Sequence, residues 1–315
     1  MAYRYGFPAS SLPLASLQRP VNMASRVWMW HPVRMTTWGK ASLAGVPQRS
    51  DGGDDHLRED VRSHVLNTAV RLLLDGDGLT VGLGHLGFEG IIKEADVPRT
   101  TAYRVWPRKE RFLEDLLRRL ADVTSPCTDS VFDDMSIEAA FAELHRRMDD
   151  LDDPLGRRAT LVEMCRVGSE RQHNVIISSP EWRTYLALIA TMQSVDDDLA
   201  NDLCSRIRKV ESVGAEKVAN TYQTILKLLG FKSRIQPLTD LVFLGSASLY
   251  GTLIMTSTRH EFSEARSGID PFNTGSQADW SLPAIAYTST IIGVLEEDPE
   301  YDLENAINQL RSSPR

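Results

Sequence analysis

Helical periodicity is the feature that most limits what this chain can fold into. From His56 almost to the C-terminus, apolar residues recur at spacings of three and four, which is the repeat of one face of an α-helix. The first such segment ends at the helix-breaking residues Gly76 and Gly78. No segment shows a clear strand pattern. The sequence therefore predicts an all-α fold.

Breaking residues divide this periodic region into helices of unequal length. After the first helix, short helices are predicted around 88–95 and 99–106, followed by one at 108–122. Further helices are predicted near 136–149, 155–173, 180–199, 202–229, 237–259, 281–296 and 302–311. A loop is predicted over 261–280, because glycine and proline interrupt the pattern there.

Composition excludes several classes of protein. The 315 residues are 42% hydrophobic and 25% charged, which is the balance of a soluble globular protein. No run of about 18 consecutive apolar residues is present, so no membrane span is predicted. Cys127, Cys165 and Cys204 lie far apart with no His at metal-ligand spacing, which argues against a zinc site or a disulfide framework. We expect a cytoplasmic protein without metal or cofactor.

Charge is distributed unevenly along the chain. Residues 1–50 contain six Lys or Arg and no Asp or Glu, whereas residues 123–315 contain 18 basic and 29 acidic side chains. An acidic body repels nucleic acid, so any contact with DNA needs a local basic face. Residues 97–111 provide one, with five basic side chains against Glu110 alone.

The N-terminal 55 residues lack helical or strand periodicity and finish in the turn-like run Asp51-Gly52-Gly53-Asp54-Asp55. We interpret residues 1–55 as a disordered basic extension or linker. A translation start downstream, a basic arm that touches the DNA backbone and an organelle-targeting segment remain alternatives. The sequence does not show whether this segment is a genuine part of the protein.

Residues 91–110 carry an ordered set of apolar, polar and aromatic residues around a short turn. Two short helices joined by a three- or four-residue turn are the layout of a helix-turn-helix. With these residues, the segment resembles the DNA-binding signature of the TetR family of bacterial transcriptional regulators. The matching positions are Ile91, Ala95, Val97, Thr101, Tyr103, Trp106, Lys109 and Glu110. Two positions depart: Asp96 replaces the usual turn glycine, and Pro98 replaces the usual Ser or Thr cap.

Physical chemistry supports a DNA-reading role for this segment independently. Arg99 and Thr100 lie at the start of the second short helix, where they can reach base edges in the major groove, and no acidic neighbour is expected on the face of Arg99. Phosphate contacts are expected from Thr101, Tyr103 and Lys109. Arg104 is either a DNA contact or part of a solvated face. For Trp106, core packing is favoured over DNA contact.

The resemblance implies what the segment after residue 122 does. It predicts a helix-turn-helix domain at 56–122 and a helical ligand-sensing and dimerisation domain at 123–315. Small or apolar residues on two helices are candidates for the dimer interface, although all could equally be internal core: Gly245, Ser248, Gly251, Thr252, Thr288 and Ile292. Candidate ligand-binding residues, for which plain core packing is the alternative, are Met164, Trp182, Tyr185, Met192, Tyr222 and Tyr250.

These features predict a regulator rather than an enzyme. We expect a ligand-responsive repressor that binds a palindromic double-stranded DNA operator as a homodimer, with an activator of the same architecture as an alternative. A magnesium-dependent isoprenoid-diphosphate enzyme is a weaker alternative, suggested by the acidic cluster Asp149, Asp150, Asp152 and Asp153. The sequence leaves the effector, the operator and the target genes open.

Overall fold

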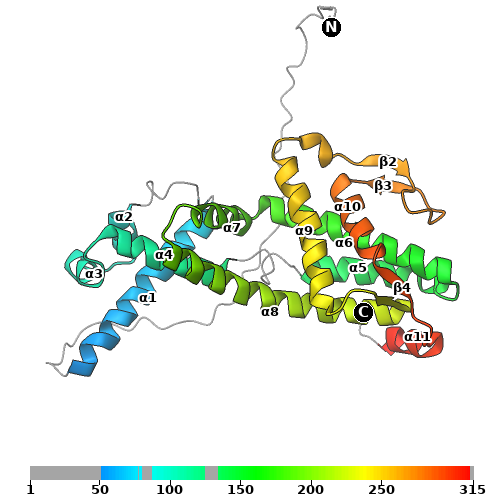
Figure 1. Ribbon diagram of the computed structural model, residues 1–315, viewed down its shortest axis with the longest axis horizontal. Coiled ribbons are helices and arrows are strands. Elements are labelled where there is room, and N and C mark those ends of the chain that lie inside the picture. Colours follow the sequence, from blue (N-terminus) through cyan, green and yellow to red (C-terminus); the bar gives the residue numbers. More distant parts are fainter. Residues whose placement is uncertain (1–50, 77, 80–86, 125–133, 313–315) are drawn as a thin grey trace, which may run out of the picture. The chain divides into compact units, whose positions relative to one another are not determined.

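A computed structural model describes residues 51–76, 78–79, 87–124 and 134–312 (Figure 1). These residues are mostly helical, so the predicted all-α class is confirmed. The chain divides between Arg49 and Ser50, and the part from Ser50 onward forms one compact unit. Most of the predicted 1–55 extension lies outside the described residues.

Four helices make up the N-terminal part of the described chain. They are α1 (Asp51–Asp75), α2 (Phe88–Glu94), α3 (Arg99–Val105) and α4 (Lys109–Val123). Helix α1 packs against α2, α3 and α4, so it supports both short helices. The prediction of a turn at 51–55 was wrong, because α1 already begins at Asp51. Acidic residue types suit the first turn of a helix, where the helix dipole is positive.

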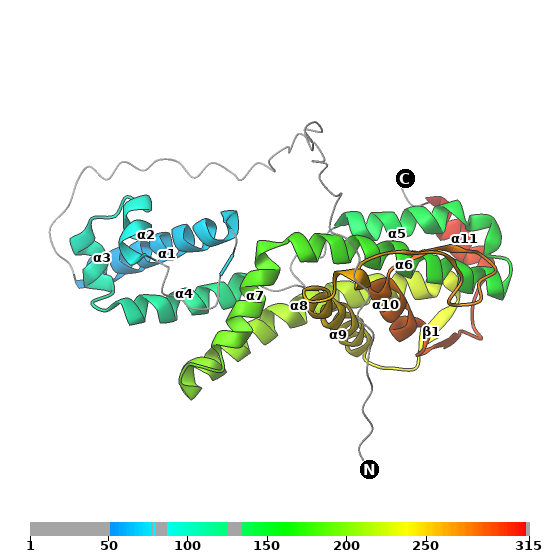
Figure 2. The same cartoon turned by 90° about the horizontal axis from the view of Figure 1, so that it is seen from above.

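The remaining helices follow the predicted order with shifted boundaries. They are α5 (Asp134–Arg146), η2 (Met148–Asp150), α6 (Pro154–Ser178), α7 (Pro180–Thr191), α8 (Asp197–Leu229), α9 (Leu238–Thr256), η3 (His260–Phe262), α10 (Leu282–Ile292) and α11 (Leu303–Ser312). Helix α8 begins earlier than predicted because the Asp196 carboxylate accepts a hydrogen bond from the Leu199 N–H at 2.9 Å and caps the helix. Helix α6 packs against α5 and α10, and α9 packs against α8 and α10 (Figure 2).

Four short strands correct the prediction that the chain contains none. Strand β1 (Phe231–Ser233) pairs antiparallel with β4 (Leu295–Glu297), with Phe231 opposite Glu297. Strands β2 (Arg266–Ile269) and β3 (Ala278–Trp280) form a hairpin within the predicted 261–280 loop. Segments of three or four residues are too short to show a two-residue repeat.

A shared hydrophobic core crosses the predicted domain boundary near residue 122. Leu116 and Leu120 of α4 belong to the same buried cluster as Leu188 of α7 and Leu203 and Ile207 of α8. This packing joins the first four helices to the rest of the compact unit.

Helix α9 is the one helix among the described residues that is long and apolar enough to cross a membrane, with a mean hydropathy of 1.4. One such helix is weak evidence for a span, since core helices of soluble proteins pass the same test. In this structure α9 packs against α6, α8 and α10.

Candidate functional site

The connection between α2 and α3 has a defined backbone geometry. The Val97 N–H donates to the Ile92 carbonyl at 3.2 Å and the Asp96 N–H donates to the Lys93 carbonyl at 3.1 Å. Together these bonds form a Schellman motif, in which the residue after the cap adopts a left-handed conformation. Asp96 has a φ of 51°, as expected for a residue that replaces glycine in this turn. Helix α3 then begins at Arg99, with Pro98 at the N-cap position.

Buried aromatic residues fix the orientation of α3. Trp106 is buried and its indole Nε1 donates a 2.7 Å hydrogen bond to the buried carboxylate of Asp115. Its ring packs edge-on against Phe88 and Phe112. The expectation that Trp106 is a core residue is therefore confirmed. Because the inner side of α3 is held in this way, its opposite side faces outward.

The residues predicted to contact DNA gather on and beside this outward side. Arg99, Thr100, Tyr103 and Arg104 are exposed, whereas Thr101 and Lys109 are partly buried. Among the described residues, none forms an ion pair with Arg104 or Lys109 in the structure. These two cations are accordingly available to an anionic partner.

One acidic residue, Glu89 of α2, contacts this surface. Its Oε1 atom lies 2.9 Å from Nη2 of Arg99 and accepts a 2.6 Å hydrogen bond from the Tyr103 hydroxyl. The Arg99 guanidinium also lies over the Tyr103 ring, 5.4 Å from its centroid. The expectation that Arg99 has no acidic neighbour was wrong, because it considered α3 alone and not the adjacent α2.

Helices α4 and α8 are joined by a network of ion pairs. Asp202 of α8 accepts hydrogen bonds from Arg118 and from Arg206, each at 2.8 Å. Arg206 also binds both carboxylate oxygens of Asp122, at 3.0 and 2.9 Å. The hydrogen bond from Arg118 lowers the pKa of the Asp202 carboxyl below its usual value. This network links α4, which follows the outward-facing helix, to the longest helix of the body.

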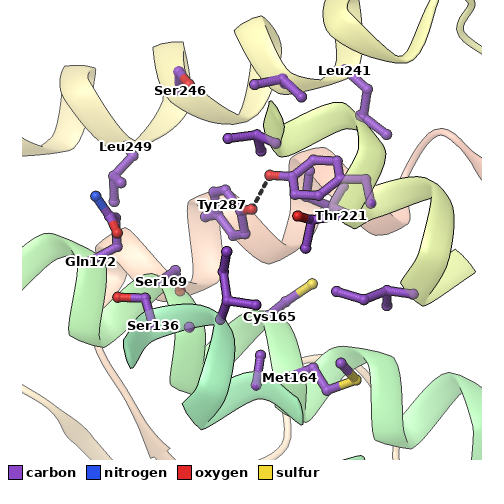
Figure 3. Close-up of a pocket in the computed structure, with 18 of the residues that line it drawn as sticks. Ser136, Met164, Cys165, Ser169, Gln172, Thr221, Leu241, Ser246, Leu249 and Tyr287 are labelled. Atoms are coloured by element: carbon purple, nitrogen blue, oxygen red, sulfur yellow. Dashed lines mark hydrogen bonds between the residues drawn. The ribbon is translucent and has the colours of Figure 1, made fainter. Parts of the chain in front are cut away.

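A cavity of about 110 Å³ lies between α5, α6, α8, α9 and α10. Figure 3 shows Cys165, Ser169 and Gln172 of α6 on one side, Thr221 of α8 on another and Tyr287 of α10 between them. Most of the remaining lining is aliphatic. The cavity is thus an apolar space with a small number of hydrogen-bonding groups, the usual character of a site for a small organic molecule.

Two tyrosine hydroxyls meet at this cavity. The hydroxyls of Tyr222 and Tyr287 share a hydrogen bond, marked by the dashed line in Figure 3. Burial raises the pKa of the Tyr287 hydroxyl well above its usual value, and burial raises the pKa of the Cys165 thiol to about 12. Both groups are therefore uncharged at neutral pH.

Three of the six predicted ligand-binding residues, Met164, Tyr222 and Tyr250, line this cavity. The other three, Trp182, Tyr185 and Met192, do not line it. Trp182 stacks on Tyr185, whose hydroxyl donates to Glu211, and Met192 packs against the core that includes Leu188. Residue type alone did not separate cavity-lining aromatic residues from ordinary core residues.

Sequence reasoning also missed lining residues, including Cys165, Ser169, Gln172, Thr221 and Tyr287. The sequence did contain a signal for the three lining residues on α6. Cys165, Ser169 and Gln172 are spaced by three or four residues, so they place small or polar groups on an inward-facing stripe of α6. The residues of α8 and α10 had no comparable signal, because only the fold brings them to α6.

The predicted dimer-interface residues divide into two groups. Gly245 packs inside the chain, where a Cβ atom would lie 3.1 Å from the Tyr287 ring, and Thr288 is fully buried. These two residues cannot contact a second copy, and their assignment is corrected. Gly251 is exposed, while Ser248, Thr252 and Ile292 are partly buried. An exposed apolar stripe on α9 was missed: Phe243, Leu244, Ile254 and Met255.

The acidic clusters have local structural roles. The Asp153 carboxylate accepts a hydrogen bond from the Gly156 N–H and caps α6, while Asp149 and Asp150 lie in η2. Among the described residues, no group of three or more His, Cys, Asp or Glu side chains could hold a metal ion. The cap explains why acidic residues precede Pro154.

Comparisons of the chain with protein-family models, with characterised proteins and with solved structures gave no match. What the chain does is therefore inferred from its own residues and their geometry.

Proposed function

We propose that this protein is a DNA-binding transcriptional regulator of the TetR type, acting as a ligand-responsive repressor. The observation that carries the proposal is the exposed side of α3, which follows a Schellman turn at Asp96 and presents Arg99, Thr100, Tyr103 and Arg104. The sequence resemblance at residues 91–110 covers this same segment. A short helix with a basic, exposed side and a firmly packed inner side is suited to the major groove of DNA.

The exposed residues divide into two roles in this proposal. Arg99 and Thr100 read base edges, because they stand at the N-terminal end of α3. Tyr103, Arg104 and Lys109 bind phosphate oxygens, with Thr101 in support, and so fix the register of the protein on the duplex. Lys109 is the first residue of α4, where the backbone N–H groups of a helix start also favour an anion.

Dimerisation is proposed to occur through α9. Its exposed side carries Phe243, Leu244, Ile254 and Met255, and only 28% of its apolar stretch is buried within the chain. Exposed apolar side chains that share one side of a helix mark a candidate interaction site. A second copy related by a twofold axis would cover it with the same residues and would place two α3 helices on a palindromic operator.

The cavity is proposed as the effector site. It lies against α8, which the Asp202 network connects to α4. A ligand that prefers one position of α8 would shift the relative position of the two DNA-reading helices in the dimer and release the operator. An activator of the same architecture would have the same DNA-reading, dimerisation and effector sites, but it would raise transcription instead of lowering it. No described feature favours the isoprenoid-diphosphate enzyme, and a cytoplasmic location accords with a DNA-binding role.

Selection of binding sites from a random DNA library tests this proposal. The expected result is enrichment of one palindromic sequence whose half-sites lie about one helical turn apart, or a multiple of it. The matched control is a chain in which Arg99 and Thr100 are both replaced by Ala. Enrichment of the same sequence by that control, or of no sequence by the wild type, would contradict the proposal.

A further inference from the structure

We propose that the cavity between α5, α6, α8, α9 and α10 binds an uncharged, mostly apolar organic molecule that carries a hydroxyl or carbonyl group, and that Tyr287 hydrogen-bonds to that group. This inference rests on the proposed function only for its regulatory meaning, since binding to the cavity does not require DNA.

The absence of charge in the lining excludes ionic ligands. None of the described residues that line the cavity is Asp, Glu, Lys, Arg or His. An ion transferred from water into an apolar space without a counter-charge loses its hydration and gains nothing that replaces it. A carboxylate, phosphate or ammonium group would therefore bind poorly, whereas a neutral molecule loses little hydration free energy when it enters the cavity.

The tyrosine pair supplies the polar contact. A phenol oxygen donates one hydrogen bond and accepts up to two, and either hydroxyl can be the donor in the bond between Tyr287 and Tyr222, so Tyr287 can still donate to or accept from a ligand group. Burial keeps the Tyr287 hydroxyl and the Cys165 thiol protonated, because it raises the pKa of both groups. A ligand hydroxyl or carbonyl meets this requirement without introducing charge.

The size of the cavity limits the ligand. Its volume is about 110 Å³, whereas an engineered apolar cavity of roughly 150 Å³ in another protein takes up benzene. Pockets for drug-sized ligands begin at roughly 300 Å³. A molecule with one ring and a short side chain is therefore at the upper limit of this space and enters with shifts of the lining side chains, whereas a drug-sized molecule does not fit.

Four probes with a similar skeleton test the ligand class: 2-phenylethanol, propylbenzene, phenylacetate and 2-phenylethylammonium. Their binding to the full chain, measured by isothermal titration calorimetry at pH 7 without DNA, separates the effects of charge and hydrogen bonding. We expect 2-phenylethanol to bind most tightly, propylbenzene about fivefold more weakly, the factor for one neutral hydrogen bond, and the two ions not measurably. An ion that binds as well as 2-phenylethanol, or no binding of either neutral probe, would overturn the proposal.

Three variants locate the binding. Tyr287→Phe should weaken 2-phenylethanol about fivefold and leave propylbenzene unchanged, because only a hydroxyl is lost. Cys165→Phe should abolish binding of both neutral probes by filling the cavity, with circular dichroism confirming that the variant is folded. Tyr185→Phe is the matched control, since Tyr185 bonds Glu211 outside the cavity, and it should bind like the wild type. Unchanged binding of 2-phenylethanol by both Tyr287→Phe and a folded Cys165→Phe would overturn the proposal.

The two proposals fail separately. Retained DNA binding together with no uptake of neutral probes would overturn the ligand assignment and leave the regulator proposal intact. Uptake of 2-phenylethanol at Tyr287 by a protein that binds no DNA would overturn the regulator proposal and keep the assignment of the cavity.

Discussion

The Tyr103 hydroxyl of α3 donates a 2.6 Å hydrogen bond to Glu89 Oε1 of α2, and the same oxygen lies 2.9 Å from Arg99. Glu89 therefore holds two of the residues proposed to contact DNA. In the proposed complex, base edges and phosphate oxygens must replace this carboxylate as the partner of Arg99 and Tyr103. DNA binding is thus a competition between an internal anion and an external one.

Neutralising Glu89 should strengthen DNA binding. Glu89→Gln keeps a hydrogen-bond acceptor near Tyr103 but removes the negative charge beside Arg99. Because the ion pair is exposed, we expect the affinity for DNA to rise by at most about fivefold, equivalent to about 1 kcal/mol. Fluorescence anisotropy on operator DNA measures the change. Glu264→Gln, with the same charge change at an exposed position outside the DNA-reading helices, is the control; weaker binding by Glu89→Gln would contradict the competition.

Replacing Arg99 and replacing Lys109 should weaken DNA binding in different ways. Arg99→Ala should cost about 1–3 kcal/mol on the operator and relax base choice at one position, because a base contact carries sequence information. Lys109→Ala should weaken binding to every DNA sequence, because a phosphate contact carries no sequence information. It should also lower the slope of log affinity against log salt concentration by about one. Titrations on operator and random DNA at several salt concentrations distinguish the two. An equal loss on both DNAs for Arg99→Ala would remove its base-reading role.

The Asp202 network should make stability depend on acid pH. Because hydrogen bonding lowers the pKa of Asp202 in the folded state, its stabilising contribution is present above the unfolded value of about 3.9 and is lost as pH falls through the folded value. We expect Asp202→Asn to lower the free energy of unfolding at pH 7 by about 0.5–1 kcal/mol, a small value because the pair is partly exposed.

Urea unfolding at neutral and acid pH checks this expectation. The difference between wild type and Asp202→Asn should shrink as the pH is lowered through the titration of the carboxyl group. Asp149→Asn removes an exposed carboxylate in η2 and should change stability little at any pH. A difference for Asp202→Asn that stays constant with pH would show that the charge of Asp202 is not what stabilises the contact between α4 and α8.

Charge placed on the exposed side of α9 should prevent dimerisation. Ile254→Glu puts a carboxylate within the proposed apolar interface, where a second copy would bury it without a partner. We expect a dimer for the wild type and a folded monomer for the variant in analytical ultracentrifugation. Leu155→Glu, at a more exposed apolar position on α6, should remain dimeric. A dimeric Ile254→Glu would place the interface elsewhere.

The parts of the fold that depend on local sequence could be predicted. Helix α4 buries Phe112, Leu116 and Leu120, which repeat every four residues along one face, and the positive φ of Asp96 agrees with its place in a turn that usually holds glycine. Strands β1 to β4 could not be predicted, because each has only three or four residues. The start of α8 was misplaced because Asp196 resembles a solvated loop residue until its cap to Leu199 is seen.

The candidate sites also divide into parts that the local sequence predicts and parts that depend on how distant helices pack. The exposed side of α3 follows from one short segment, whereas Glu89 reaches Arg99 only through the packing of α2 against α3. Tyr222 and Tyr287 are 65 residues apart in the sequence, and their contact depends on how α8 and α10 pack. Gly245 was assigned to an interface because it is small, but its size serves the close approach of Tyr287.

The most direct test of the DNA-reading function is fluorescence anisotropy of the purified protein on DNA from just upstream of its own coding sequence, titrated with salt and compared with random DNA. A regulator of this kind that controls its own gene should bind the upstream DNA more tightly than random DNA by a factor above about 10³. Weak binding that is equal on random DNA, on the upstream DNA and on the sequence most enriched from the random library, for the full chain and for residues 56–315 alike, would contradict the account.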